Sequence, residues 1–253
     1  MGQLDGKVAV VTGGGRGLGR AYCEALAGEG AAVVAADIRD TAETVAAVEG
    51  AGGKIIGLPL DVVDMDSCSV MADAALAAFG RIDVLVNNAA LYGDISGGRF
   101  DKLPDDQWDR VMAVNVKGIW QCCKACVPAM REAGGGSIVN ISSLAAKYGM
   151  AYGVDYATSK AAVIGMTRSL ARELGRDWIR VNAVAPSAVL TEGTDEFMGE
   201  KRDGMLDAIA QGQSLKSNLE PTDMTGTIIY LASEASRFVT GQTIMVDGGT
   251  VML

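Results

Sequence analysis

Tyr156 and Lys160 stand four residues apart in the segment Tyr156-Ala157-Thr158-Ser159-Lys160. On a helix this spacing places the two side chains on the same face, one turn apart. A phenol has an ordinary pKa of about 10 and is a poor base at neutral pH, but a nearby ammonium favours the phenolate. The pair could therefore move a proton on and off an alcohol oxygen. Because Tyr-x3-Lys also arises by chance, its weight depends on the residues around it.

Ser143 and Asn115 are the other polar residues that could share in this chemistry. Ser143 follows the apolar run Ile138-Val139-Asn140-Ile141, and Asn115 lies inside a long predicted helix, where an amide is a mediocre helix former. The chain has no histidine, which excludes the Ser-His-Asp triad and the common zinc hydrolases. Proton transfer must then fall to Tyr, Lys, Asp, Glu, Cys or water.

A glycine-rich turn, Thr12-Gly13-Gly14-Gly15-Arg16-Gly17-Leu18-Gly19, follows the first predicted strand and opens the first predicted helix. Glycines permit positive φ and let a pyrophosphate approach the backbone, while the helix N-terminus supplies free amides. In this position the turn predicts a nucleotide site, although its Gly-x3-Gly-x-Gly spacing differs from the common Gly-x-Gly-x2-Gly.

Asp37 ends the second predicted strand, after the glycine-rich turn. A carboxylate there can accept a hydrogen bond from a ribose 2′-hydroxyl and repels a 2′-phosphate, which favours NAD over NADP. Arg16 and Arg39 keep NADP open, since either could bind a phosphate.

Short β-branched runs alternate with longer, alanine-rich stretches of helical period. The predicted strands are residues 7–12, 32–37, 54–60, 82–86, 136–142, 178–185 and 243–247, and the predicted helices are residues 17–29, 41–51, 67–79, 105–132, 155–174 and 220–233. This alternation and the continuous apolar strands are typical of a buried parallel sheet. We predict an α/β fold in one domain, residues 1–253: a single Rossmann-like, doubly wound, seven-stranded parallel sheet with helices on both faces.

The carboxyl edge of such a sheet is where ligands bind. Asp61-Val62 ends the third predicted strand, and Asn87-Asn88-Ala89-Ala90 ends the fourth. Residues 186–219 form a long irregular connection, which is typical of a functional lid. One apolar face of a short helix is expected there from Phe197, Met198, Met205, Leu206 and Ile209.

The net charge of −9 and the pI near 4.6 argue against nucleic acid and anionic membranes as partners. The odd number of cysteines suggests no disulfide framework, and we interpret Cys123-x2-Cys126 as two small buried residues rather than half of a metal site. No metal site is expected. The apolar runs are of strand length and no secretion signal is evident, so a cytoplasmic protein is expected.

Taken in order, these motifs resemble the short-chain dehydrogenase/reductase family over essentially the whole chain. The resemblance is carried by the Thr-Gly-x3-Gly-x-Gly turn, Asn-Asn-Ala-Ala, Asn115, Ser143, Tyr156-x3-Lys160, Arg180-Val181-Asn182, and Thr240-Gly241-Gln242 leading to Asp247-Gly248-Gly249. It implies that Tyr156 is the general base or acid, that Lys160 lowers the phenol pKa and holds the nicotinamide ribose, and that Ser143 stabilises the substrate oxygen. Asn115 would hold a water that links Lys160 to solvent.

The resemblance also implies the binding residues. For NAD these are Gly13, Arg16, Gly17, Leu18, Gly19, Asp37, Ile38, Asp61, Val62, Asn88, Ala89, Ala90, Tyr156, Lys160, Pro186, Ser187, Val189 and Thr191; for the substrate they are Ser143, Leu144, Tyr156, Tyr92, Tyr152 and Ser187. The chain departs from the family pattern twice. Pro186-Ser187 replaces Pro-Gly and narrows the pocket, and Ala90 replaces a glycine and alters the packing of its loop.

The expected function is NAD-dependent interconversion of a hydrophobic, aromatic or cyclic secondary alcohol and its ketone. The rival within the family is a 3-ketoacyl-thioester reductase, which usually prefers NADPH. The rival from another class is a nucleotide-binding regulator without turnover, although such relatives normally lose the Tyr or the Lys. The resemblance further implies a homotetramer, with a dimer face on residues 105–132 and 155–174 and another contact at Val251-Met252-Leu253.

Overall fold

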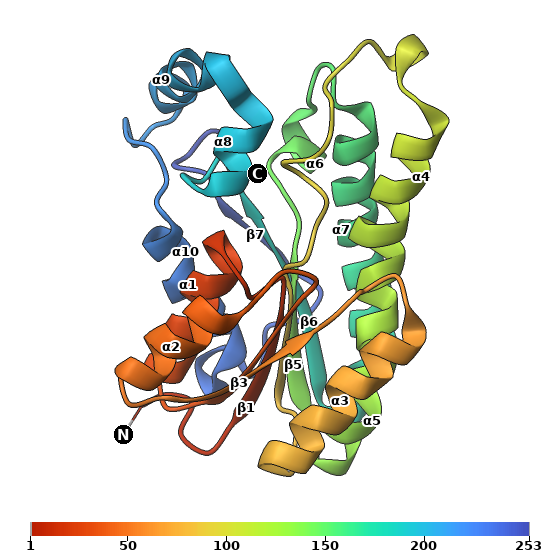
Figure 1. The fold of residues 1–253 in the computed structure, drawn as a ribbon, viewed down its shortest axis with the longest axis vertical. Helices are drawn as coiled ribbons and strands as arrows, with labels where there is room; N and C mark the ends of the chain where they lie inside the picture. Colours follow the sequence, from red (N-terminus) through yellow and green to blue (C-terminus); the bar gives the residue numbers. More distant parts are fainter. Residues whose placement is uncertain (1, 253) are drawn as a thin grey trace.

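Seven parallel strands form the central sheet of the computed structural model, which describes residues 2–252 (Figure 1). The spatial order is β3-β2-β1-β4-β5-β6-β7. The strands are β1 (Val8–Thr12), β2 (Ala32–Asp37), β3 (Lys54–Pro59), β4 (Val84–Asn87), β5 (Gly136–Ile141), β6 (Ile179–Pro186) and β7 (Thr243–Val246). The predicted α/β fold and parallel sheet are confirmed, and each predicted strand end lies within two residues of the observed one.

Alternate residues of the strands pack on opposite faces of the sheet. In β1, Val10 belongs to one hydrophobic core, whereas Ala9 and Val11 belong to another. Val10 pairs with Val34 of β2 on one side and with Leu85 of β4 on the other. Buried on both faces, these strands are apolar throughout, as expected for a parallel sheet.

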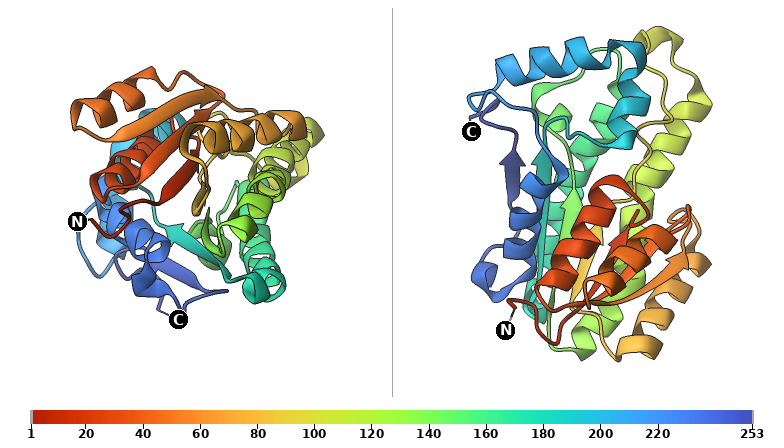
Figure 2. Two further views of the ribbon diagram at one scale, coloured as in Figure 1. Left: turned by 90° about the horizontal axis from the view of Figure 1, so that it is seen from below. Right: turned by 60° about the vertical axis from the view of Figure 1, so that its left-hand side comes forward.

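Helices cover both faces of the sheet, as the left view of Figure 2 shows, in which the molecule is seen from below. One core packs against α1 (Gly17–Gly28), α2 (Ala42–Gly50) and α10 (Pro221–Ala232). The other packs against α3 (Met65–Phe79), α5 (Ile119–Glu132) and α7 (Val154–Leu174). Helix α10 begins at Pro221, where Glu220 and Asp223 form a capping box, so its predicted start is confirmed.

The predicted helix 105–132 is interrupted. It consists of α4 (Asp105–Met112), a π-helical turn (Ala113–Gly118) and α5, in continuous succession. A π turn accommodates one extra residue within a helix and is often found at functional sites. Asn115 lies inside this turn.

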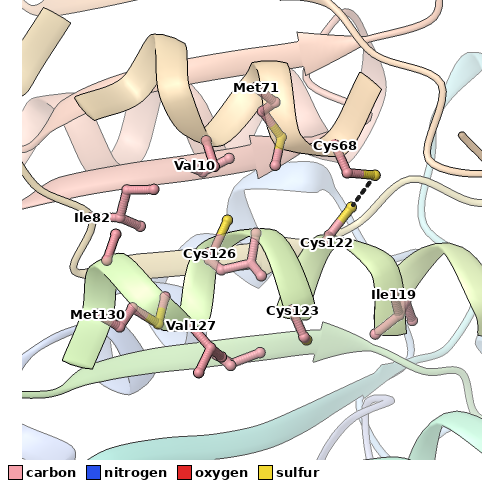
Figure 3. Packing of buried hydrophobic residues seen from close by; sticks show 14 of the residues in the cluster. Val10, Cys68, Met71, Ile82, Ile119, Cys122, Cys123, Cys126, Val127 and Met130 are labelled. Atoms are coloured by element: carbon pink, nitrogen blue, oxygen red, sulfur yellow. Dashed lines mark hydrogen bonds between the residues drawn. The ribbon is translucent and has the colours of Figure 1, made fainter. Parts of the chain in front are cut away.

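Cysteines of α3 and α5 pack in the core between these two helices (Figure 3). Cys68 and Cys122 face one another with 3.8 Å between their sulfur atoms. Cys123 and Cys126 are buried as well, in keeping with their interpretation as packing residues. Burial raises the pKa of Cys123 to about 12, so this thiol stays protonated at neutral pH.

The segment 186–219 holds two helices instead of the one expected. These are α8 (Glu192–Met198) and α9 (Arg202–Gly212), joined by a 3-10 turn, Gly199–Lys201. They lie at the end of the sheet where the short helix α6 (Ala145–Tyr148) also lies, opposite the end at which the N terminus enters (Figure 1). None of the helices described is both long and apolar enough to cross a membrane.

Candidate active site and nucleotide site

Helix α7 carries Tyr156 and Lys160 and is fastened to the carboxyl end of β5. The Nζ atom of Lys160 donates a hydrogen bond of 2.9 Å to the carbonyl oxygen of Ile141, the last residue of β5. The hydroxyl of Ser142 donates to the carbonyl oxygen of Lys160 at 2.8 Å. The ammonium lies 5.6 Å from the centre of the Tyr156 ring, so the two side chains share one face of the helix as predicted.

Burial controls the protonation of this pair. It lowers the pKa of Lys160 to about 8 and raises the pKa of Tyr156 above its ordinary value. The neighbouring Tyr92 raises the phenol pKa further, and a hydrogen bond with Ser143 lowers it. Burial is the largest cause of the raised phenol pKa, because loss of hydration penalises the phenolate. That Lys160 lowers this pKa stays a prediction.

Asn115 joins three segments from its place in the π turn. Its Oδ1 accepts from the amide of Leu91 at 2.7 Å, and its Nδ2 donates to the Leu91 carbonyl at 3.2 Å and to the Ser159 hydroxyl at 3.1 Å. Ser159 in turn donates to the carbonyl of Tyr156 at 2.7 Å. The side chain is fully buried and its polar atoms bond protein groups, so it positions α7 against the loop after β4. Its part in a water chain stays a prediction.

The glycine-rich turn has the shape of a cradle for a diphosphate. Gly13 and Gly17 have φ of 67° and 52°, and a Cβ on Gly19 would lie only 1.8 Å from the carbonyl oxygen of Gly13. Within the described residues, α1 begins without a side-chain cap, which leaves its first amides for a ligand. Asn88 braces the turn by donating from Nδ2 to the carbonyls of Thr12 and Gly13, at 3.0 and 3.1 Å. These features fit the phosphates of a dinucleotide.

Asp37 lies in a cavity of about 270 Å³ beside this turn. Its carboxylate accepts from the amides of Gly15 and Arg39, both at 2.9 Å, and is held at the end of β2. The nucleotide-binding residues predicted from the sequence that line this cavity are Gly13, Arg16, Asp37, Ile38, Asp61, Val62, Asn88, Ala89 and Ala90. Leu60, Leu91 and Val114 also line it and were missed, because their only signal in the sequence is apolar character.

A larger cleft of about 550 Å³ opens above Tyr156 and Lys160. The predicted residues that line it are Arg16, Gly17, Leu18, Asn88, Ala90, Tyr92, Ser143, Leu144, Tyr156, Lys160, Pro186, Ser187, Val189 and Thr191. Helices α8 and α9 both contribute apolar side chains, among them Phe197, Met198, Met205 and Ile209. Leu206, expected on the same face, is instead buried outside the cleft lining.

A column of aromatic rings connects α8 to Tyr156. Tyr92 stacks on Phe197 of α8 with 4.8 Å between ring centres, and its other neighbour, Tyr156, lies at 5.1 Å. Burial raises the pKa of the Tyr92 phenol, and the Thr194 side chain of α8 lowers it. The cleft is therefore apolar and aromatic on the side that faces the Tyr156 phenol.

Two residues that were predicted for the site, Tyr152 and Gly19, do not line either cavity. Tyr152 lies outside the cleft lining: it is 68% exposed and has a φ of 64°, which turns its side chain away. Met150 and Tyr148, which were missed, line the cleft instead, since helix α6 and the following turn set the direction of this loop. Gly19 lines neither cavity; it lets α1 pass close to Gly13.

Comparison with known proteins agrees with this geometry. The family model described as enoyl-(acyl carrier protein) reductase matches residues 13–251. A 3-oxoacyl-[acyl-carrier-protein] reductase of Thermotoga maritima is 39% identical over 252 residues, which are 99% of this chain and 100% of that protein. D-threitol dehydrogenase of Mycolicibacterium smegmatis is 38% identical over 250 residues, which are 98% and 94% of the two chains.

A solved structure with the same arrangement is carveol dehydrogenase from Mycobacterium avium in complex with NAD. It is 32% identical and superposes with a TM-score of 0.94, over 99% of each chain. The matched family model, the relatives matched over almost their full length and the shared fold lead to one conclusion. The chain belongs to the short-chain dehydrogenase/reductase family of oxidoreductases.

Proposed function

We propose that this oxidoreductase uses NAD to interconvert a hydrophobic secondary alcohol, aromatic or cyclic, and its ketone. One observation carries the proposal: Tyr156 and Ser143 line an apolar cleft that adjoins the cavity holding Asp37. The cleft accepts a compact apolar substrate, and Asp37 can accept a hydrogen bond from a ribose 2′-hydroxyl.

Each residue of the site has a separate task in this reaction. Ser143 donates a hydrogen bond to the substrate oxygen, and Tyr156 takes the alcohol proton or returns it to the ketone. The nicotinamide, when bound, exchanges a hydride with the substrate carbon. Lys160, whose pKa burial lowers to about 8, holds positive charge close to the phenol as proton transfer proceeds. It lines the same cleft and would hold the nicotinamide ribose. The roles of Gly13, Gly17 and Leu18 in holding the diphosphate follow from the α1 N-terminus.

The first test is the absorbance of reduced nicotinamide with purified protein, NAD or NADP, and a panel of secondary alcohols. Turnover with NAD on aryl or cyclic alcohols is expected, and Tyr156→Phe should abolish it while the far-UV circular dichroism stays unchanged. A panel in which only small anionic hydroxyacids react would contradict the substrate assignment. Unchanged turnover in Tyr156→Phe would contradict the mechanism.

The second candidate function is reduction of a 3-ketoacyl thioester with NADPH. It is favoured by the reductase of Thermotoga maritima and by the description of the matching family model. Acetoacetyl-coenzyme A with NADPH tests it directly: faster turnover than with any alcohol and NAD would place this function first. Absence of turnover in both assays would favour the non-catalytic regulator.

Three further proposals come with the family. The chain acts as one domain in which residues 186–219 form a lid over the cleft, and it works in the cytoplasm. It assembles as a homotetramer whose dimer face includes α4, α5 and α7; Trp120 on α5 is 45% exposed and supports this. Light scattering after size-exclusion chromatography tests the assembly. The expected contact at Val251-Met252-Leu253 includes Leu253, which lies outside the described residues.

A further inference from the structure

Both arginines near the nucleotide cavity are engaged by carboxylates. Arg16 donates from Nη1 and Nη2 to the two carboxylate oxygens of Glu196, at 2.5 and 2.7 Å. The Nη2 atom of Arg39 lies 3.6 Å from a carboxylate oxygen of Asp94. The bidentate Arg16–Glu196 pair uses the same guanidinium N–H groups that would otherwise bind a phosphate.

These two ion pairs lie beside Asp37. Arg16, Arg39, Asp94 and Asp37 line one cavity, and Glu196 reaches its rim against Gly93, where a Cβ would lie 2.3 Å from the carboxylate. The hydrogen bond from Arg16 lowers the pKa of Glu196, and the charge of Arg39 lowers it further. Glu196 therefore stays ionised at neutral pH.

We propose that Glu196, assisted by Asp94, is a specificity-determining residue that makes this cavity select a dinucleotide without a 2′-phosphate. The proposal rests on the proposed NAD site beside Asp37. A 2′-phosphate brings close to two negative charges and oxygens that require free donors. Here both arginines are paired with carboxylates. The carboxylates of Asp37, Asp94 and Glu196 adjoin the position that a 2′-phosphate would take. A 2′-hydroxyl adds no charge and can donate to Asp37, so it is not opposed.

The Arg16–Glu196 pair also links nucleotide choice to the lid, because Glu196 belongs to α8 and Arg16 to the glycine-rich turn. The two residues are 180 positions apart in the chain. A lid whose carboxylate reaches the turn closes the cavity with negative charge on the side where a phosphate would sit. The selection then acts in the closed state.

Dissociation constants of NADH and NADPH test the proposal without turnover, read from the fluorescence of the reduced nicotinamide. In Glu196→Gln the Kd for NADPH should fall about tenfold, because Arg16 is released and one negative charge is lost, while the Kd for NADH changes less than about threefold. Asp195→Asn is the matched control. It removes the neighbouring carboxylate of α8, which pairs with Arg202 and not with Arg16, and should keep the wild-type ratio of the two constants.

The double variant Arg16→Ala/Glu196→Gln tests whether Glu196 acts through its pairing with Arg16. If Glu196 acts by occupying Arg16, the gain in NADPH affinity disappears when that cation is removed. The proposal is overturned if Glu196→Gln leaves the ratio unchanged or weakens both nucleotides equally. A gain that persists without Arg16 supports selection through the charge of Glu196 rather than through its pairing with Arg16. Wild-type protein that binds neither nucleotide would overturn the proposed function, and this inference with it. If both proteins bind the nucleotides but Glu196→Gln has the wild-type ratio of Kd values for NADH and NADPH, only the role of Glu196 is overturned.

Discussion

The ammonium of Lys160 is hydrogen-bonded to the carbonyl oxygen of Ile141 and is only 3% exposed. Its pKa is lowered from 10.5 to about 8 by burial. Between these values the unfolded chain binds more protons than the folded one, so this group makes the protein more stable as the pH rises through that interval. The burial penalty is fully present below the folded pKa and amounts to about 3 kcal/mol.

Lys160→Met should remove this penalty, and its effect should depend on pH. The free energy of unfolding of the variant minus that of the wild type is expected to be most positive below pH 8 and to fall by about 3 kcal/mol by pH 10.5. Urea denaturation at several pH values, with a reductant present, measures it. Taking the difference cancels the titration of the buried cysteines. A difference that stays constant with pH would contradict the assignment.

Gly19→Ala should damage both folding and nucleotide binding. The added Cβ would lie 1.8 Å from the Gly13 carbonyl oxygen, so the turn must shift, at a cost of about 1–3 kcal/mol. Gly28→Ala at the other end of α1 is the control, since no atom lies within 4 Å of its Cβ. That variant should gain about 0.5–1 kcal/mol. Thermal unfolding and NADH titration of both variants check this, and equal behaviour of the pair would count against a close-packed turn.

Asn115→Ala should loosen the contact between the π turn and the loop after β4. The amide and carbonyl of Leu91 would lose their buried partners, which destabilises the fold by about 1–3 kcal/mol. Ser159→Ala removes only one of the three bonds made by Asn115 and should destabilise less. Denaturation measures both, and kcat is expected to fall more than KM rises in Asn115→Ala because Tyr156 is mispositioned. Equal destabilisation by the two variants would argue against this role.

Tyr92 variants separate ring packing from the hydroxyl group. Tyr92→Phe keeps the ring that stacks on Phe197 and should change the KM for an apolar alcohol less than about threefold. Tyr92→Ala removes this ring and should raise the same KM about tenfold. Steady-state kinetics with a cyclic alcohol provide the comparison. If Tyr92→Phe had the larger effect, the contacts of the Tyr92 hydroxyl would matter more than the apolar surface of the ring.

Local patterns were sufficient to predict the sheet and much of the two cavities. Strands such as β1 are continuous apolar runs bounded by glycine-rich turns, and nothing beyond the run itself is needed to recognise them. The parallel arrangement then brings the strand ends to one edge, which is why Asp37 and Asn88 could be assigned to a common cavity.

Tertiary packing decided the features that the sequence did not reveal. The π turn at Asn115 replaces a regular helix without a proline or glycine at that residue to mark it. Met150 rather than Tyr152 lines the cleft, because the positive φ of Tyr152 turns the side chain outward. The pairing of Arg16 with Glu196 has no local signal at all, since it joins a turn near the start of the chain to a helix near its end.

The π turn at Ala113–Gly118 fixes a length as well as a side chain. Each residue of a helix rotates the chain by about 100°, so one residue fewer in this turn would close it into a regular helix and carry Asn115 away from Leu91 and Ser159. It would also rotate the core face of α5, with Cys122 and Cys126, relative to α4. Single-residue deletions here should therefore be far more damaging than substitutions at Lys117, the exposed position of the same turn.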